Sequence, residues 1–413
     1  MVSAYKEDSL GKDDALAIAE KIKSGILDVK TVTEDSIARA QSVNEDLNAL
    51  VVEDFDSALN RSQGTFSGIF NGVPTFIKDT DEVQGLPLFL GSSTLPGEKS
   101  TKTSRAAQQI LDTGLNCLGT TTTPEFGLTG TTESKRFGST CNPWNTAYST
   151  GGSSGGSSAM VAAGVIPIAH ANDGAGSIRI PASCCGLVGM KASRGRIKDK
   201  EVPGYLPANI LHDGVVTRTV RDTWAFHSAI EKNIPATEFP PIGDITEKKP
   251  NALLIAVLTE DCTGRQSPDI LVKATHEVAN RCESLGHNIE IISNPFYSRF
   301  DLDFWLLWSH LAFYIRYGGG KEFNPNFDHS KLEQWSKYLV KKHWKSLHKI
   351  PFAFRRLRQF ASDYENLFEK YDILLTPTLG TTTPPLGKFG PEVDGETHWE
   401  RIIEFLPYTK YQN

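Results

Sequence analysis

The fold of this chain is decided by residues 149–196, which read STGGSSGGSSAMVAAGVIPIAHANDGAGSIRIPASCCGLVGMKASRGR. Glycine and serine are dense here, but they are interleaved with apolar runs such as Ala159 to Ile168. A flexible linker rich in glycine and serine would lack those apolar runs. The glycines are therefore interpreted as turns packed inside a hydrophobic core.

Outward from this stretch, the pattern alternates between strands and helices. Residues 253–258 (LLIAVL) read as a buried strand, Leu271 to Leu285 as an amphipathic helix closed by Gly286, and Asn288 to Ile292 as another strand. This β-α-β unit predicts an α/β fold, with a large mixed, twisted sheet covered by helices on both faces.

The N-terminal part is predicted to begin with two helices. The first spans Lys12 to Ser24, and the second spans Thr33 to Gln41 with Thr31 or Thr33 as its N-cap and acidic residues in its first turn. A strand over residues 73–77 ends at Lys78 and Asp79. Further elements are a helix at 104–113, a strand from 116 to 119, a helical turn opened by Pro124, a helical region from 304 to 371 and a strand at 372–376.

Composition excludes several classes of protein. The 413 residues are 39% hydrophobic and 22% charged, and the formal net charge is -6. These values are ordinary for a globular protein, and the charge predicts neither a nucleic-acid nor a membrane partner. The N-terminus lacks the apolar segment of a secretory signal, and the longest apolar stretch, Phe304 to Tyr317, reads as a buried helix. A cytoplasmic location is expected.

The six cysteines indicate neither a metal site nor a disulfide framework. They are Cys117, Cys141, Cys184, Cys185, Cys262 and Cys282, and none has the spacing of a zinc site. We expect reduced, mostly buried thiols, no metal ion and no cofactor.

A candidate nucleophile lies at Ser177. The turn Gly174 to Ser177 has little side-chain bulk, so several backbone N–H groups can converge on one point, as an oxyanion hole requires. A serine needs a base, and His170 lies in an apolar run where a packed core residue is expected. Lys78 at the end of a buried strand is the candidate base, since removal from water favours a neutral amine.

The stretch 151–196 resembles the signature of the amidase signature family of serine hydrolases. The resemblance rests on the GGSSGG block, the aspartate before a small-residue turn, the GSIR-P segment and the CGLVG block. Residues 72–79 (GVPTFIKD), 119–126 (GTTTTPEF) and 142–144 (NPW) are similar to further landmarks of that family. Residues 206–222 (LPANILHDGVVTRTVRD) are closest to bacterial amidases, including those similar to 6-aminohexanoate cyclic-dimer hydrolases.

The resemblance implies a Ser–cis-Ser–Lys catalytic group. Ser177 would form the acyl-enzyme, Ser153 would bridge through an unusual cis peptide bond, and Lys78 would be the base. The implied oxyanion hole uses backbone N–H groups of Gly174, Ala175, Gly176 and Ser177, and the implied acyl pocket uses Thr150, Gly127 and Leu128. Asp173 is expected to shape the turn, and Arg179 to be a buried ion-pair partner.

The predicted activity is hydrolysis of a small-molecule carboxylic amide, linear or cyclic, to an amine or ammonia and a carboxylate. Alternatives are the glutaminase subunit of an amidotransferase and an inactive, truncated family member. A phosphate-binding loop is disfavoured because GGSSGG lacks the Lys-Ser/Thr ending of a P-loop. The resemblance also allows a homodimer.

The expected domain organisation is a single domain over 1–413, with the signature core at 149–196 and a variable helical insertion at 295–370 that shapes the acyl pocket. Trp305, Trp308, Phe313 and Tyr314 in that insertion are expected to be core residues. The family resemblance further predicts two last strands and a closing helix beyond Asn413. Without them, a hydrophobic sheet edge would remain unpaired.

Overall fold

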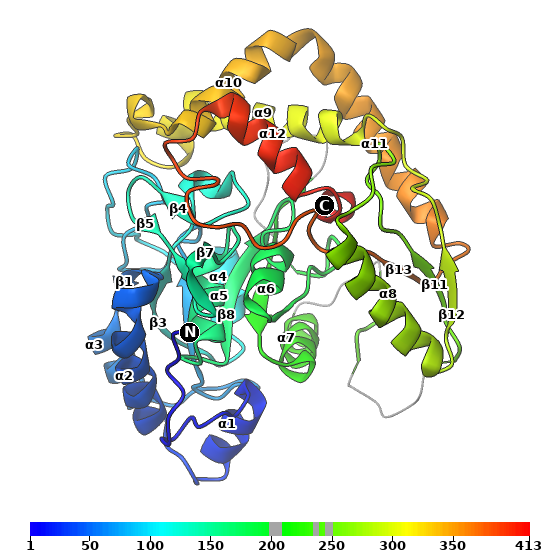
Figure 1. Ribbon diagram of the computed structural model, residues 1–413. Coiled ribbons are helices and arrows are strands. Elements are labelled where there is room, and N and C mark those ends of the chain that lie inside the picture. The colour runs from blue at the N-terminus through cyan, green and yellow to red at the C-terminus, as the bar shows by residue number, and fades with distance from the viewer. Residues whose placement is uncertain (198–208, 234–238, 244–250) are drawn as a thin grey trace.

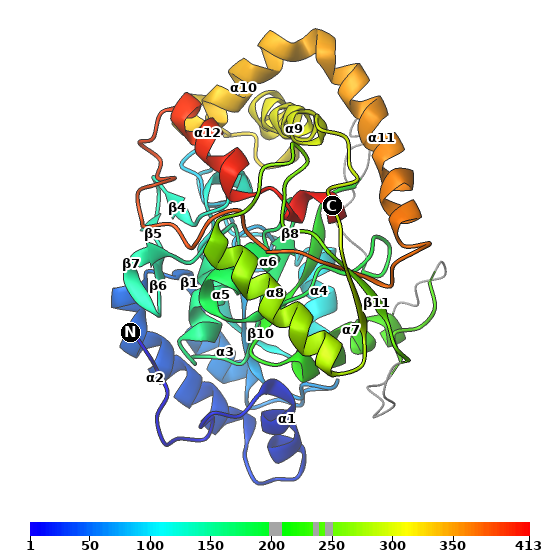
Figure 2. The same cartoon turned by 45° about the vertical axis from the view of Figure 1, so that its right-hand side comes forward.

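The computed structural model of the chain describes residues 1–197, 209–233, 239–243 and 251–413. Residues 206–208 of the motif at 206–222 lie outside these ranges. The predicted α/β architecture is confirmed, because strands lie in the interior with helices around them (Figure 1). Figure 2 shows the same arrangement turned by 45° about the vertical axis, with the helices of residues 300–405 above the strands.

The N-terminal helices differ in their limits from the prediction. Helix α1 spans Ala15–Lys23 and begins three residues later than expected, whereas α2 spans Val29–Leu47 and begins four residues earlier and ends six residues later than expected. Its N-cap is Asp28, whose carboxylate accepts the Thr31 N–H at 2.8 Å. Aspartate caps a helix at least as well as threonine, so the start moves to Asp28 and the expected acidic residues fall outside the first turn.

Two three-stranded sheets form the core around the signature. The first has the order β1 (Leu50–Glu53), β3 (Asn116–Thr121), β2 (Pro74–Lys78), and its β2 and β3 are parallel. The second is antiparallel, with the order β8 (Ile168–Asp173), β10 (His212–Thr217), β9 (Val188–Gly189). Strands β2 and β8 lie side by side, where the Thr75 hydroxyl donates to Ile168 O at 3.0 Å. This contact brings the edge strands of the two sheets together.

A third sheet contains the predicted β-α-β unit. Strands β11 (Leu254–Val257) and β12 (Asn288–Ile291) are parallel and are joined through helix α8 (Asp269–Ser284). Strand β13 (Ile373–Leu375) pairs with β11 on its other side, also in parallel. The prediction of a parallel unit in this part of the chain is therefore confirmed.

Four helices form the upper end of the molecule in both views (Figures 1 and 2). They are α9 (Phe300–Glu322), α10 (Gln334–Ser346), α11 (Ile350–Leu367) and α12 (Gly395–Phe405). The apolar stretch Phe304 to Tyr317 lies within α9, as predicted. Within the described ranges, every helix is too short or too polar to cross a bilayer.

Shorter elements complete the structure. The two hairpins are formed by β4 (Glu133–Ser134) with β5 (Gly138–Ser139) and by β6 (Cys141–Asn142) with β7 (Asn145–Ser149). The remaining helices are α3 (Phe55–Arg61), α4 (Arg105–Leu111), α5 (Gly155–Ala162), α6 (Arg179–Cys185) and α7 (Val220–Asn233). The 3-10 turns are η1 (Glu125–Gly127), η2 (His329–Lys331), η3 (Leu347–Lys349) and η4 (Thr409–Gln412).

Candidate active site

The structure brings Lys78 and Ser153 into direct contact. Lys78 is the last residue of β2 and is fully buried, and Ser153 lies just before α5. The Lys78 Nζ atom is 2.7 Å from Ser153 Oγ and 2.9 Å from Ser154 Oγ. The peptide bond between Gly152 and Ser153 is cis. A buried amine is thereby held against a serine hydroxyl that faces a cavity.

Asn172 is a partner of the lysine that the sequence left without a role. Its Oδ1 atom accepts a hydrogen bond from Lys78 Nζ at 2.6 Å, and its Nδ2 donates to Thr80 Oγ1 at 2.7 Å. His170 and Asn172 are two residues apart in β8, so their side chains point to the same face of the strand. The alternation of polar residues beside the predicted lysine strand is the signal that could have identified Asn172.

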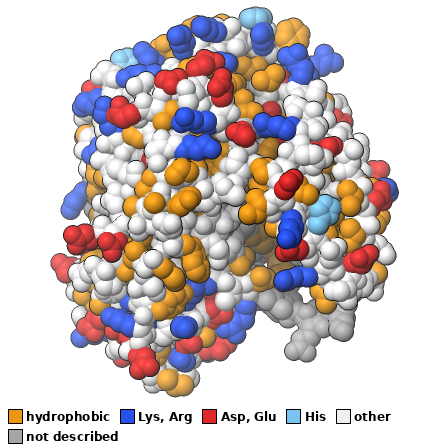
Figure 3. All heavy atoms as spheres, viewed as in Figure 1, with side chains coloured by type: hydrophobic (Ala, Val, Ile, Leu, Met, Phe, Trp, Pro, Cys, Tyr) orange, Lys and Arg blue, Asp and Glu red, His pale blue; other side chains and the backbone are white. Residues whose placement is uncertain are grey.

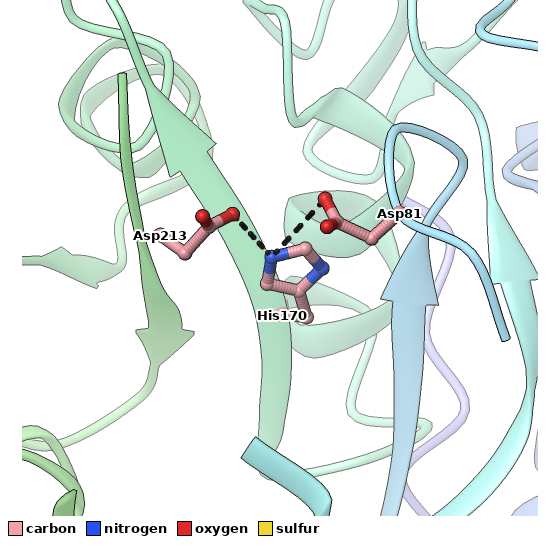
Figure 4. A group of neighbouring side chains, drawn as sticks. All are labelled: Asp81, His170 and Asp213. Carbon is pink, nitrogen blue, oxygen red and sulfur yellow. Dashed lines mark hydrogen bonds and ion pairs between the residues drawn. The ribbon is translucent and has the colours of Figure 1, made fainter. Parts of the chain in front are cut away.

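His170 supports the backbone of the lysine from that same face. The Lys78 N–H donates to His170 Nδ1 at 3.2 Å, so the proton on the other nitrogen, Nε2, is available to Asp213 Oδ1 at 3.1 Å. Asp81 approaches the same nitrogen from another direction, with a carboxylate oxygen 4.0 Å from Nε2 (Figure 4). The prediction that His170 is a buried core residue is confirmed, although its neighbours are polar.

The Asp81, His170 and Asp213 cluster also has the residue types of a metal site. Its candidate ligand atoms lie within 4.8 Å of one another. The same atoms already take part in hydrogen bonds, since Ser104 Oγ and Thr80 Oγ1 donate to the Asp81 carboxylate at 2.8 and 3.1 Å. The polar atoms of the cluster are therefore already hydrogen-bonded, and the cluster touches Lys78 through the bond from its backbone N–H to His170.

The turn that carries Ser177 is held by Asp173, as predicted. The Asp173 carboxylate accepts the N–H groups of Gly176 and Ile178 at 2.6 and 3.2 Å, and Arg179 pairs with both of its oxygens at 2.9 Å. The guanidinium holds the pKa of Asp173 well below its usual range, although burial acts in the opposite direction. Arg179 is thus the ion-pair partner that the sequence predicted.

The hydrogen bond to Asp173 changes the set of available amides in the turn. Because the Gly176 N–H is donated to that carboxylate, it is no longer directed at a substrate. Across the described residues, the N–H groups of Gly174, Ala175 and Ser177 have no recorded hydrogen-bond partner. The Thr409 hydroxyl donates to Ala175 O at 2.6 Å and fixes the turn from the C-terminal side.

A cavity of about 430 Å³ opens above the two serines. Ser153, Ser177, Asn172, Gly174 and Gly127 all line it. Its apolar wall is formed by Leu90, Phe126, Leu211, Trp308, Leu311, Tyr314, Ile315 and Phe323, and its charged side chains are Glu82, Lys102, Arg105, Asp213 and Glu322. Trp308, Leu311, Tyr314 and Ile315 come from one side of α9, which the sequence assigned to the core.

The three residues expected in the acyl pocket have different positions. Gly127 lines the cavity, and a Cβ atom there would lie 3.1 Å from Ser153 Oγ. Thr150 and Leu128 are buried and are not among the lining residues. Thr150 packs against Gly155 at the start of α5, and Leu128 O accepts the indole N–H groups of Trp308 and Trp335, both at 2.9 Å.

Asp79, which follows the lysine, is fully buried, and the effect of that burial on its pKa can be measured. Its carboxylate accepts the N–H groups of Phe89 and Gly91 at 3.0 Å, and burial raises its pKa to about 7. The unfolded chain ionises near pH 4, so the folded state binds a proton more tightly between pH 4 and 7. The contribution of Asp79 to the free energy of unfolding is therefore fully present below pH 4. It decreases by about 1.4 kcal/mol per pH unit as the pH rises towards 7.

We therefore expect Asp79→Asn to flatten the dependence of unfolding free energy on pH between about 5 and 7. Urea denaturation of both proteins at several pH values measures the two slopes. Asp112→Asn, at an exposed helix end, serves as the control and should retain the wild-type slope. Equal slopes for wild type and Asp79→Asn would contradict the raised pKa.

Comparison with known proteins identifies relatives over the whole chain. Residues 31–413 match the family described as Amidase. The chain is 41% identical to a Mycobacterium tuberculosis protein with the provisional name amidase AmiC, covering 100% of this chain and 87% of the relative. It is 33% identical to a 6-aminohexanoate-cyclic-dimer hydrolase of a Pseudomonas species, covering 92% of this chain and 81% of the relative.

Solved structures agree with the sequence comparison. The structure of a 6-aminohexanoate cyclic dimer hydrolase complexed with substrate superposes with a TM-score of 0.85 at 30% identity, over 98% of this chain and 89% of that one. A bacterial aryl acylamidase of the amidase signature family superposes with a TM-score of 0.81 at 24% identity, which shows the shared fold.

Proposed function

This chain belongs to the amidase family, and we propose that it hydrolyses carboxylic amides through an acyl-enzyme on Ser177. The observation that carries the proposal is the 2.7 Å contact between Lys78 Nζ and Ser153 Oγ. A lysine without access to water favours its neutral amine, and a neutral amine can accept a proton from a hydroxyl. Ser153 and Ser177 line the same cavity, which is consistent with a proton relay between the two hydroxyls when a substrate is bound.

The proposed reaction has two halves. Lys78 takes a proton from Ser153, Ser153 takes one from Ser177, and Ser177 Oγ forms a bond to the amide carbonyl carbon. The carbon–nitrogen bond then breaks, and the relay returns a proton to the leaving amine. In the second half, water loses a proton to the same relay and attacks the ester, which releases the carboxylate and restores Ser177.

The negative charge on the carbonyl oxygen needs donors that are already in place. We assign this role to the N–H groups of Gly174, Ala175 and Ser177, and exclude that of Gly176 because Asp173 accepts it. Fixed backbone donors stabilise the tetrahedral intermediate without reorganisation, which is why the pair of buried Asp173 with partly buried Arg179 matters for rate.

The cavity suggests the substrate class. A volume of about 430 Å³ with a largely apolar wall suits a small, apolar amide, linear or cyclic. Residues 295–370 supply part of that wall through α9, which supports their proposed role in shaping the pocket. The glutaminase alternative is less well supported, since free glutamine carries charged α-amino and α-carboxyl groups besides its polar carboxamide, which suits a largely apolar wall poorly.

The proposal also covers the cellular location and the oligomeric state of the protein. All six cysteines have free thiols in the structure, which supports a reducing, cytoplasmic setting. The homodimer stays a prediction.

The proposed function is tested by covalent labelling and a substrate panel. A fluorophosphonate should attach to Ser177, as mapped by peptide mass spectrometry, and block hydrolysis of small aliphatic, aryl or cyclic amides. Glutamine is included in the panel as the alternative substrate. An adduct on a different serine, or turnover of glutamine alone, would overturn the proposal.

A further inference from the structure

One segment of this acidic chain is strongly basic. Residues 334–362, here called the cationic arch, hold eight lysines and arginines and no aspartate or glutamate, whereas the whole chain has a net charge of -6. The segment comprises α10, η3 and most of α11. In Figures 1 and 2 it forms the arch at the upper end of the molecule, away from the sheets.

The arch presents large apolar side chains together with its positive charges. Trp344, Leu347 and Phe352 are 53%, 50% and 64% exposed, and they fall within nine residues around the turn from α10 to α11. Exposed Lys341 and Lys345 lie three residues before and one residue after Trp344, on the same face of α10. In Figure 3, lysine and arginine side chains gather along this upper edge, with hydrophobic side chains between them.

The outer cations of the arch have no carboxylate partner among the residues that the structure describes. Within the part of the chain that the structure describes, no recorded ion pair joins Lys341, Lys345 or Lys349 to a carboxylate. Arg356 behaves differently, because its Nε and Nη2 atoms donate to the carboxylate of Asp303 in α9 at 2.5 and 2.6 Å. On the inner side of the arch, Arg356 thus forms an ion pair that joins α11 to α9. On the outer side, the three lysines keep their positive charge without a carboxylate partner among the described residues.

We propose that the outer side of the cationic arch binds an anionic lipid surface. Its lysines fit the phosphates and carboxylates of lipid headgroups, and its tryptophan, leucine and phenylalanine fit the boundary between headgroups and acyl chains. A nucleic acid would attract the lysines equally but would leave the three apolar side chains in water. The net charge of the whole chain does not predict a membrane partner. The concentration of positive charge in residues 334–362 nevertheless gives the chain one surface that can bind anionic lipid.

The position of the arch connects this surface with the cavity. Helix α9 packs against α10 and α11, and it also supplies Trp308, Leu311, Tyr314 and Ile315 to the cavity wall. An apolar amide dissolved in a membrane would thus be close to the helices that form the cavity. Binding to lipid does not depend on the proposed catalytic activity, so the two can fail separately.

Vesicle sedimentation of the full chain tests the proposal. We expect binding to phosphatidylcholine vesicles that contain about one third phosphatidylserine, weak binding to phosphatidylcholine alone, and loss of binding when salt rises to about 0.5 M. The triple variant Lys341→Glu, Lys345→Glu and Lys349→Glu should bind at least about 100-fold more weakly. The matched control reverses three exposed lysines elsewhere, Lys12, Lys23 and Lys273, and should bind like wild type.

Two tryptophans make the apolar contact measurable. Brominated acyl chains should quench fluorescence from Trp344, so Trp344→Phe should lose quenching while Trp144→Phe, which changes a residue of 55% exposure, retains it. Unchanged quenching in Trp344→Phe, or wild-type affinity of the triple variant, would overturn the proposal. Binding to nucleic acid without binding to anionic vesicles would overturn it as well.

Discussion

Ser177→Ala is expected to reduce amide turnover by at least about 10³-fold and to abolish labelling by a fluorophosphonate. The change removes one oxygen from a side chain that lines the cavity, and across the described residues its hydroxyl has no recorded hydrogen-bond partner. Folding should therefore be preserved. Turnover, labelling and the thermal melting temperature of the purified variant measure the three effects.

The matched control is Ser158→Ala. Ser158 lies in α5, in the same glycine and serine block, and its buried hydroxyl also has no hydrogen-bond partner within the described ranges. It should label and turn over like wild type. If Ser177→Ala kept the wild-type rate, the nucleophile would have to be a different residue.

Lys78→Met should reduce turnover by about 10²- to 10⁴-fold. Methionine has nearly the same length and is apolar, so it fills the buried site but cannot accept a proton from Ser153. The lost amine also leaves Ser153, Ser154 and Asn172 without their common partner, and we expect a lower melting temperature. Steady-state rates and thermal melts separate the catalytic loss from the structural one.

Lys273→Met on exposed α8 is the control for this substitution and should leave both measurements unchanged. Activity of Lys78→Met is best measured after confirming a cooperative melt, so that a low rate reports chemistry in folded protein. A folded variant with the wild-type rate would exclude Lys78 as the base.

Local patterns were sufficient for most of the fold. The run of β2 up to Lys78, the β-α-β unit and the buried helix from Phe304 follow from short-range periodicity and turn residues, and the structure confirms them. The start of α2 was wrong because several residues near it can cap a helix, and only their competition decides which one does.

Site residues that belong to a sequence motif could be predicted, whereas site residues assembled from distant segments could not. Lys78, Ser153 and Ser177 could be named because a long ordered motif carries them, and their roles remain proposals. Asn172 and the Asp81–His170–Asp213 cluster are assembled from β8, β10 and the residues after β2, which lie far apart in the sequence. No local pattern states which residues from three segments will face one another.

By itself, then, the sequence determined the α/β class, the family resemblance and the three residues proposed for catalysis, since these depend on local periodicity and on an ordered motif. Only the tertiary structure decided that Gly176 donates to Asp173, which side chains of α9 line the cavity, and that Thr150 and Leu128 do not line it. It also placed lysines that pair with no carboxylate of the described ranges beside exposed apolar side chains on one outer edge. These features depend on which surfaces are buried together, and burial is a property of the packed chain rather than of any segment.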